Sequence, residues 1–228
     1  MIFIDKYDIS FWPKAVFSSC VLCVLMLSLY LLLAGEMTTS TWLRPYQLSG
    51  DLGRRVLFAG CLILYFIRLQ VTVWVFEKRK FTWREMMTIS ILMPFVVWAY
   101  ARAGGSGYQT VGPVAIAGLL VYLAGSYINT RSEYLRLVWK SKPQNKGRLY
   151  TEGLFRHSMH INYFGDIVLF TGLSIMTQQI SMLVIPLVMG LNFVFFIIPR
   201  LDDYLEQKYA DAFREYSKKT KKLIPLVY

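Results

Sequence analysis

The amino-acid sequence predicts an all-α integral membrane protein with about six transmembrane helices, followed by a cytosolic amphipathic helix and tail. Hydrophobic residues make up 55% of the 228 residues, which is more than an ordinary soluble domain contains. These residues lie in long blocks, and long apolar blocks favour membrane spans over one large soluble core. The lysines and arginines gather in short segments beside the blocks, as they do in multi-pass proteins.

The apolar blocks define the expected helices. A helical span needs about 20 apolar residues. Five blocks meet or nearly meet this length: Ala15–Ala34, Val56–Phe76, Met86–Ala101, Val111–Ile128 and Ile180–Pro199. A sixth block, Phe164–Thr177, is short and is followed by two glutamines that suit a tight turn. We therefore expect Phe164–Pro199 to form a helical hairpin.

Positive charge orients these spans. With six spans, the three basic segments at residues 78–84, 131–156 and 208–222 fall on one side of the membrane. Cytosolic loops carry the excess of Lys and Arg, so both termini and the long loop are predicted to be cytosolic. Three arginines are then predicted to lie outside, which is a minor conflict: Arg44, Arg54 and Arg55.

The chain reads as one membrane domain with two regions. Residues 1–125 are predicted to be N-terminal transmembrane helices, and residues 126–228 a cofactor-binding region made of the cytosolic loop, the hairpin and the tail. Beyond Pro199, apolar residues recur at helical spacing and predict an amphipathic helix of about 18 residues. The residues that set this spacing are Leu201, Leu205, Tyr209 and Phe213.

Charge and cysteine content exclude several classes of function. The net charge of +11 comes from residues beside the apolar blocks, where it sets orientation and meets anionic headgroups, so we expect no nucleic-acid partner. Cys20 and Cys23 form a C-x-x-C inside an apolar helix without further ligands, so they are predicted to pack and no metal site is expected. The sequence contains no P-loop and no G-x-G-x-x-G fingerprint.

The segment Gly153–Asp166 concentrates the chemistry of the chain. Polar and ionisable groups at a membrane boundary are costly unless they are paired, solvated or used. The segment contains both histidines of the protein and six such groups in all: Arg156, His157, His160, Asn162, Tyr163 and Asp166. The alternative is a solvated loop whose charge only fixes topology.

Further candidates lie on the flanking helices. Glu133 and Arg136 are three residues apart and share a helix face with Lys140, although an ordinary ion pair would give the same spacing. At the mouth of the last span, carboxylates could hold an amine or a ribose hydroxyl, or simply cap a helix. The remaining candidates are Tyr122, Tyr127, Arg148, Arg200, Asp203 and Glu206.

From Ser126 onward the sequence resembles a membrane superfamily. It groups sterol reductases, the C-terminal domain of steroid 5-alpha-reductases, isoprenylcysteine carboxyl methyltransferases and phospholipid methyltransferases. The reductase branch reads G-L-x-x-x-x-R-H-x-N-Y-x-G-D/E, and this chain matches it at Gly153, Leu154, His160, Asn162, Tyr163, Gly165 and Asp166. Met159 stands where the branch has Arg, so Arg156 or His157 would supply the positive charge. The tail also resembles the family, with Ala210 in place of the usual Gly.

Two branches of the superfamily imply two activities. Ile161 replaces the proline of the methyltransferase motif R-H-P-x-Y, and Asn162 and Asp166 match the reductases, so the reductase branch is favoured. The acidic pair Asp202-Asp203 also matches the carboxylates with which the methyltransferases hold S-adenosylmethionine. A third alternative is a membrane scaffold that kept the fold without the chemistry.

The reductase branch implies hydride transfer from NADPH to a carbon–carbon double bond of a sterol-like or isoprenoid lipid. Its cofactor's ribose or nicotinamide end is expected at Asn162, Tyr163 and Asp166, and the proton donor at Tyr122 or Tyr127. The phosphates are expected at Arg136, Lys140, Arg148 and Arg200. The methyltransferase alternative implies a pocket lined by His160 and Tyr163. Its S-adenosylmethionine ammonium would then be held by Asp203 or Glu206.

Overall fold

The computed structural model describes residue 8, residues 10–34, residue 48, residues 50–107 and residues 109–228. These residues form two compact units. One unit holds the described residues up to Leu119 together with residues 173–182. The other holds residues 120–172 and 183–228, and therefore almost all of the predicted site. Arg44, one of the arginines predicted to lie outside, falls beyond the described residues.

Helices dominate the described residues, which contain no β-strand. The helices are α1 (Phe11–Ala34), α2 (Leu52–Val71), α3 (Trp83–Gly105), α4 (Pro113–Lys140), α5 (Ile161–Thr177), α6 (Val184–Asn192), α7 (Ile198–Tyr209) and α8 (Asp211–Lys219). Short 3-10 turns precede α5 and α6, and π-helical turns follow α2 and α6. The all-α membrane fold predicted from the sequence is thereby confirmed.

Five helical segments are long and apolar enough to cross a membrane. They are Phe11–Ala34, Leu52–Phe76, Trp83–Gly105, Pro113–Lys140 and Ile180–Tyr209. The sixth apolar helix, α5, has 17 residues and falls just short of the usual length of a span. The expected count of six spans stays a prediction that depends on α5.

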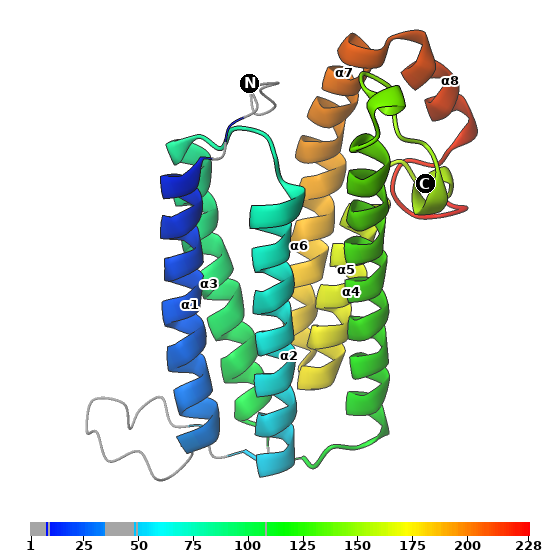
Figure 1. The fold of residues 1–228 in the computed structure, drawn as a ribbon. Coiled ribbons are helices and arrows are strands. Elements are labelled where there is room, and N and C mark those ends of the chain that lie inside the picture. Colours follow the sequence, from blue (N-terminus) through cyan, green and yellow to red (C-terminus); the bar gives the residue numbers. More distant parts are fainter. Residues whose placement is uncertain (1–7, 9, 35–47, 49, 108) are drawn as a thin grey trace. The chain divides into compact units, whose positions relative to one another are not determined.

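In the N-terminal unit, α1, α2 and α3 pack against one another (Figure 1). Phe58 of α2 is fully buried, and a Cβ at Gly104 of α3 would overlap its ring. The helices come this close because Gly104 has no side chain. Small residues at such crossings are typical of membrane helices, where close packing replaces the hydrophobic effect between helices.

A buried arginine ties the ends of three helices in this unit. Arg54 is 1% exposed, and its guanidinium donates to the carbonyl oxygens of Gly104, Met176 and Thr177. The last residues of a helix leave their carbonyls without intrahelical partners, and Arg54 fills that role for α3 and α5. This arginine is thus a structural ligand of helix ends.

In the second unit, α4 and α5 cross with their backbones in near contact. A Cβ at Gly125 would overlap the backbone nitrogen of Leu169 and stand 2.6 Å from the carbonyl oxygen of Gly165. Conversely, a Cβ at Gly165 would stand 2.6 Å from the backbone nitrogen of Asn129. Gly165 belongs to the polar segment Gly153–Asp166, and its lack of a side chain allows α4 to pack closely against α5.

The predicted hairpin forms, and its second arm continues directly into α7. Ile167 of α5 lies beside Gly190 of α6, and the Tyr163 ring stacks on Phe193 one turn further on. A π-helical turn, Phe193–Ile197, connects α6 to α7 just before Pro199. Proline cannot donate to the preceding turn and clashes with it, and a wider turn relieves that conflict.

The amphipathic segment differs from the prediction of one long helix. It is divided into α7 and α8 at Ala210, whose φ of 44° and ψ of −118° lie outside the helical region. The Ala210 amide donates to the Glu206 carbonyl (2.8 Å), which closes α7 before the chain turns. Spacing from Leu201 to Phe213 suggested a continuous face, but the turn at Ala210 redirects Phe213, which is buried.

Candidate functional site

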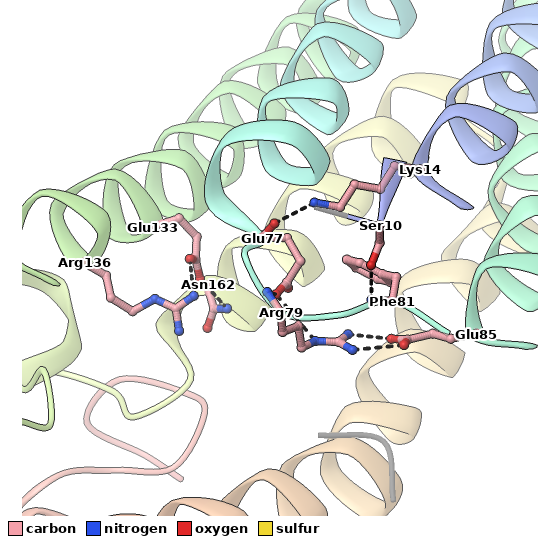
Figure 2. Close-up of polar contacts among 9 residues, drawn as sticks. All are labelled: Ser10, Lys14, Glu77, Arg79, Phe81, Glu85, Glu133, Arg136 and Asn162. Carbon is pink, nitrogen blue, oxygen red and sulfur yellow. Dashed lines mark hydrogen bonds and ion pairs between the residues drawn. The ribbon is translucent and has the colours of Figure 1, made fainter. Parts of the chain in front are cut away.

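Polar side chains from α4 and the start of α5 form what we call the Glu133 cluster: Asn129, Glu133, Arg136 and Asn162. The Asn162 amide donates to one Glu133 carboxylate oxygen (2.9 Å), and Arg136 donates to the other (2.5 Å; Figure 2). The Asn129 amide donates to the Asn162 carbonyl (2.9 Å). The pair predicted from the three-residue spacing is therefore present and is linked to the polar segment of α5.

Two members of this cluster are buried. Asn129 is 5% exposed and Glu133 6%, whereas Arg136 is exposed. Buried side-chain polar atoms almost always have a hydrogen-bond partner. The Asn129 side-chain oxygen has none among the described residues. A buried acceptor without a partner is costly.

A second group, the His160 cluster, surrounds the residue before α5 and consists of His160, Tyr163, Phe193, Asp202 and Lys222. His160 is 2% exposed, and its Nε2 forms a hydrogen bond with an Asp202 carboxylate oxygen (2.9 Å). Lys222 lies 3.3 Å from the other oxygen of that carboxylate. The rings of His160, Tyr163 and Phe193 stack with centroid distances of 5.8 and 4.6 Å.

The segment Lys221–Leu223, here called the tail strap, binds the backbone just before α5. The amides of Met159 and His160 donate to the carbonyls of Lys221 and Lys222 (2.8 and 2.9 Å). The Ser158 hydroxyl donates to the Leu223 carbonyl (2.8 Å). These bonds fix the position of His160. They also explain how the tail, distant in sequence, belongs to the candidate site.

One turn before the strap, α8 is anchored to the same loop. The Tyr216 hydroxyl donates to the Phe155 carbonyl (2.5 Å). Burial raises the pKa of Tyr216, and the nearby Asp202 carboxylate adds to this effect. Tyr216 is therefore a neutral donor at physiological pH and holds α8 against the loop.

A cavity of about 600 Å³ opens between the loop at residues 147–151 and the helices α7 and α8. This volume lies within the range of roughly 300–1,000 Å³ typical of small-molecule sites. Its lining residues with a charged side chain are Arg148, Lys208, Glu215 and Lys219. Lys140 lies at its edge, where its ammonium donates to the Arg148 carbonyl (3.0 Å) and the Tyr209 hydroxyl (2.8 Å). Basic groups thus outnumber acidic ones in this cavity.

Seven of the predicted site residues lie in the Glu133 cluster, the His160 cluster or the cavity, and the other predicted residues lie outside all three. Glu133, Arg136 and Asn162 meet in the first cluster, His160 and Tyr163 in the second, and Lys140 and Arg148 at the cavity. Asp166 is half-buried on α5, and Tyr122 is fully buried on α4. The structure brings these two residues and the following five into none of the three groups: Tyr127, Arg156, Arg200, Asp203 and Glu206.

Those outlying residues are mostly exposed. Tyr127 is 63% exposed on α4, and Asp203 and Arg200 are exposed on α7. Arg156 is exposed, and its Nε donates to the ring of the neighbouring His157 (3.4 Å). Glu206 pairs with Arg214 across the turn at Ala210 (2.7 Å), in a solvent-exposed salt bridge. Such pairs contribute little to stability.

The predicted site left out four residues of these clusters: Asn129, Phe193, Asp202 and Lys222. Asp202 had been noted in the sequence only as part of the acidic pair Asp202-Asp203. Helical periodicity could have found Asp202, because it lies four residues after the buried Ile198 and three before Leu205. Asp203 lies on the exposed side. Asn129 lies four residues before Glu133, on the same face. Lys222 has no local signal, since only the fold brings it to Asp202.

A separate polar group closes the loop between α2 and α3 in the N-terminal unit. Lys14 donates to the Glu77 carbonyl (2.8 Å), and Arg79 binds both carboxylate oxygens of Glu85 (Figure 2). The Phe81 amide donates to the Ser10 hydroxyl (3.0 Å). The six residues form three hydrogen-bonded pairs, so this arrangement is explained as loop packing.

The fold and the site together define a class of protein. It is an all-α membrane protein whose polar groups collect at the start of α5, where the C-terminal tail binds the backbone. Within the described residues, no group of three His, Cys, Asp or Glu side chains could hold a metal ion. Residues 12–220 match the family described as a protein of unknown function, DUF1295, and the chain belongs to that family. The family is part of the steroid 5-alpha-reductase and methyltransferase-like membrane superfamily.

Two relatives with named activities are similar to this chain. The 3-oxo-5-alpha-steroid 4-dehydrogenase 1 of Rattus norvegicus is 24% identical over 191 residues, which are 78% of this chain and 69% of that protein. The probable O-methyltransferase ustE of Ustilaginoidea virens is 29% identical over 118 residues, 48% of this chain and 38% of that protein. Both branches expected from the sequence are thus represented, and both relatives are named as enzymes.

Proposed function

We propose that this protein is a membrane reductase that uses NADPH to reduce a carbon–carbon double bond of a sterol-like or isoprenoid lipid. The observation that carries the proposal is the Glu133 cluster, with its buried and unpartnered Asn129 oxygen. The match to a steroid dehydrogenase along most of the chain supports the same reading. The match to an O-methyltransferase covers less of the chain.

The residues present fit the chemistry of NADPH. Its carboxamide contains an N–H donor, which the unpartnered Asn129 oxygen would accept. Its ribose and nicotinamide end would be held by Asn162, Tyr163 and Asp166. Its phosphates need cations, which Lys140 and Arg148 supply at the cavity edge. The Glu133 carboxylate is already shared by two donors, so its role is to hold Asn162 in place.

Bound NADPH would supply the hydride, while the chain binds, orients and excludes water. The tail strap and the stacked rings of Tyr163 and Phe193 close the site around His160. Tyr122 is the preferred proton donor of the two tyrosines predicted from the sequence, because it is fully buried whereas Tyr127 is 63% exposed. Substitution of Tyr122 by Phe would then remove turnover while leaving NADPH affinity unchanged.

A methyltransferase that uses S-adenosylmethionine is the second candidate, because of the match to an O-methyltransferase. In that case the carboxylate beside the pocket lined by His160 and Tyr163 is Asp202, because Asp202 pairs with His160 and Lys222. The neighbouring Asp203 is exposed. Such a reaction depends mainly on positioning, because the sulfonium already carries a good leaving group. A scaffold without activity is the third candidate, motivated by Met159 in place of Arg.

Calorimetry of the purified protein separates the three candidates. NADPH, NADH and S-adenosylmethionine are titrated in parallel into the same preparation. We expect saturable binding of NADPH and none of S-adenosylmethionine. Binding of S-adenosylmethionine alone would overturn the reductase proposal. A folded protein that binds none of the three would point to the scaffold.

A further inference from the structure

The segment Ile224–Tyr228, here called the tail turn, presents apolar side chains to the outside. Leu226 is 87% exposed and Val227 70% exposed. Ile224 and Tyr228 are 40% and 45% exposed. Apolar side chains gathered at the tip of one short turn are not explained by packing within the chain, and exposed apolar patches mark interaction sites.

Three of the four backbone amides in the tail turn donate hydrogen bonds within the turn itself. The amides of Leu223 and Ile224 donate to the Tyr228 carbonyl (2.6 and 2.7 Å), and those of Val227 and Tyr228 to the Ile224 carbonyl (3.1 and 3.0 Å). Pro225 has no amide hydrogen. In an apolar medium every unpaired backbone group is costly. The pairing of these three amides lowers the cost for the turn of lying at the membrane interface.

The tail strap holds this turn close to the level where the last span leaves the membrane. Lys222 contacts Asp202 on α7. The exposed Phe195 and Phe196 precede Asp202 by six or seven residues, and Arg200 is exposed just before it. At 1.5 Å per residue, the strap lies about 10 Å along the helix from the exposed phenylalanines. Interfacial segments bury their apolar side chains about 5–10 Å into the boundary between headgroups and acyl chains.

Basic residues precede the turn. Lys218, Lys219 and Lys221 are exposed, whereas Lys222 is engaged by Asp202. Clusters of lysine beside an apolar segment attract anionic lipid headgroups within a Debye length of the surface. This combination of free lysines and an apolar tip is the signature of a membrane-surface contact and is not required by the proposed reductase activity.

We propose that the tail turn inserts Leu226 and Val227 into the interface of the bilayer that contains the protein, and that the neighbouring lysines favour anionic lipids there. Leu226 has a φ of 67°, which is unusual for a bulky residue and turns its side chain to the tip. The lipid surface thus fixes the tail strap, and through it His160, from the outside.

The test uses the full chain with Cys20, Cys23 and Cys61 replaced by Ala. A nitroxide is attached at Leu226→Cys, or at Gln207→Cys on the exposed face of α7 as the matched control. Each protein is reconstituted into phosphatidylcholine vesicles with or without phosphatidylglycerol. Electron paramagnetic resonance then measures the collision of the label with oxygen, which concentrates in the bilayer, and with a water-soluble nickel chelate.

We expect the label at position 226 to favour oxygen in the anionic vesicles and the label at position 207 to favour nickel. The triple variant Lys218→Gln, Lys219→Gln, Lys221→Gln should shift position 226 towards nickel. Equal nickel accessibility at the two positions would overturn the insertion. Poor access of both reagents to position 226 would also overturn it, because a protein surface rather than lipid would then cover the turn. Equal insertion in neutral vesicles would overturn the part played by the lysines.

Discussion

Asn162 joins the two halves of the Glu133 cluster, because its amide binds the Glu133 carboxylate and its carbonyl accepts from Asn129. Asn162→Ala removes the first of these bonds and leaves a buried carboxylate oxygen unpaired. Losing a hydrogen-bond partner at a buried site costs on the order of 1–3 kcal/mol. We expect NADPH affinity to fall about tenfold to hundredfold, as measured by calorimetry.

Lys142→Ala is the control for this substitution, because Lys142 is exposed in the same loop region. If the segment Gly153–Asp166 served only to fix the membrane topology, it would contribute its charge and would not contact the cofactor. In that case Asn162→Ala and Asp166→Asn would leave affinity as unchanged as the control does. Equal and small effects in well-folded proteins would therefore contradict the site assignment.

Ala210 adopts a backbone conformation that glycine tolerates and alanine does not. Residues held in sparsely populated regions cost of order 1–3 kcal/mol. Ala210→Gly should therefore raise the free energy of unfolding by about 1 kcal/mol and raise the melting temperature in detergent. Ala212→Gly, two residues later inside α8, should lower it by roughly 0.5–1 kcal/mol. Destabilisation by both substitutions would show that Ala210 is not strained.

Among the helices, the α4–α5 crossing is the contact most sensitive to one methyl group. Gly125→Ala would place a Cβ against the backbone of α5, which cannot move aside as a side chain can. Overpacking of this kind costs typically 1–3 kcal/mol. We expect a lower melting temperature and weaker NADPH binding, because the Glu133 cluster lies one turn beyond the crossing.

Gly60→Ala provides the matched control for the crossing. Gly60 is exposed on α2, and a Cβ there would meet nothing within 4 Å. Alanine is the better helix former, so this variant should be neutral or more stable by up to about 1 kcal/mol. If Gly125→Ala and Gly60→Ala had the same melting temperature, the near contact of α4 and α5 would not matter for stability.

Apolar block length predicted the helices well, because the cost of an unpaired backbone in lipid forces each block into a helix. The sequence also predicted the Glu133–Arg136 pair from its spacing. The break at Ala210 was missed because alanine is the strongest helix former and gives no local sign of a turn. The family resemblance could have indicated the break, because Ala210 stands where the superfamily usually has glycine, a residue that favours turns.

The candidate site was only partly predictable, because its two clusters depend on tertiary contacts. Local spacing identified Glu133, Asn162 and His160 as chemically unusual. His160 pairs with Asp202, whereas the candidate carboxylate Asp203 is exposed on the other side of α7. Lys222 reaches that carboxylate through the tail strap, which no pattern along the chain predicts.

At the scale of the whole molecule, the untested prediction is orientation. Lys142 lies in the loop after α4, and Ser181 lies in the turn between α5 and α6; both are exposed. With basic loops on the cytosolic side, Lys142→Cys should react with an impermeant maleimide only from inside, and Ser181→Cys only from outside. Labelling of position 142 from outside would reverse the topology.

Arg54 and Arg55 are predicted to lie on the outer side, against the rule that cytosolic loops carry the excess of Lys and Arg. Their contacts explain why they are there. Arg55 donates to the Leu32 carbonyl (3.1 Å), and Arg54 binds carbonyl oxygens of Gly104, Met176 and Thr177. The last two of these residues are synthesised more than 120 residues after Arg54. While the chain emerges from the ribosome, the early helices therefore carry a cation whose final ligands do not yet exist. The insertion of α2 is consequently coupled to that of α5, because α2 acquires its final environment only when α5 is in place.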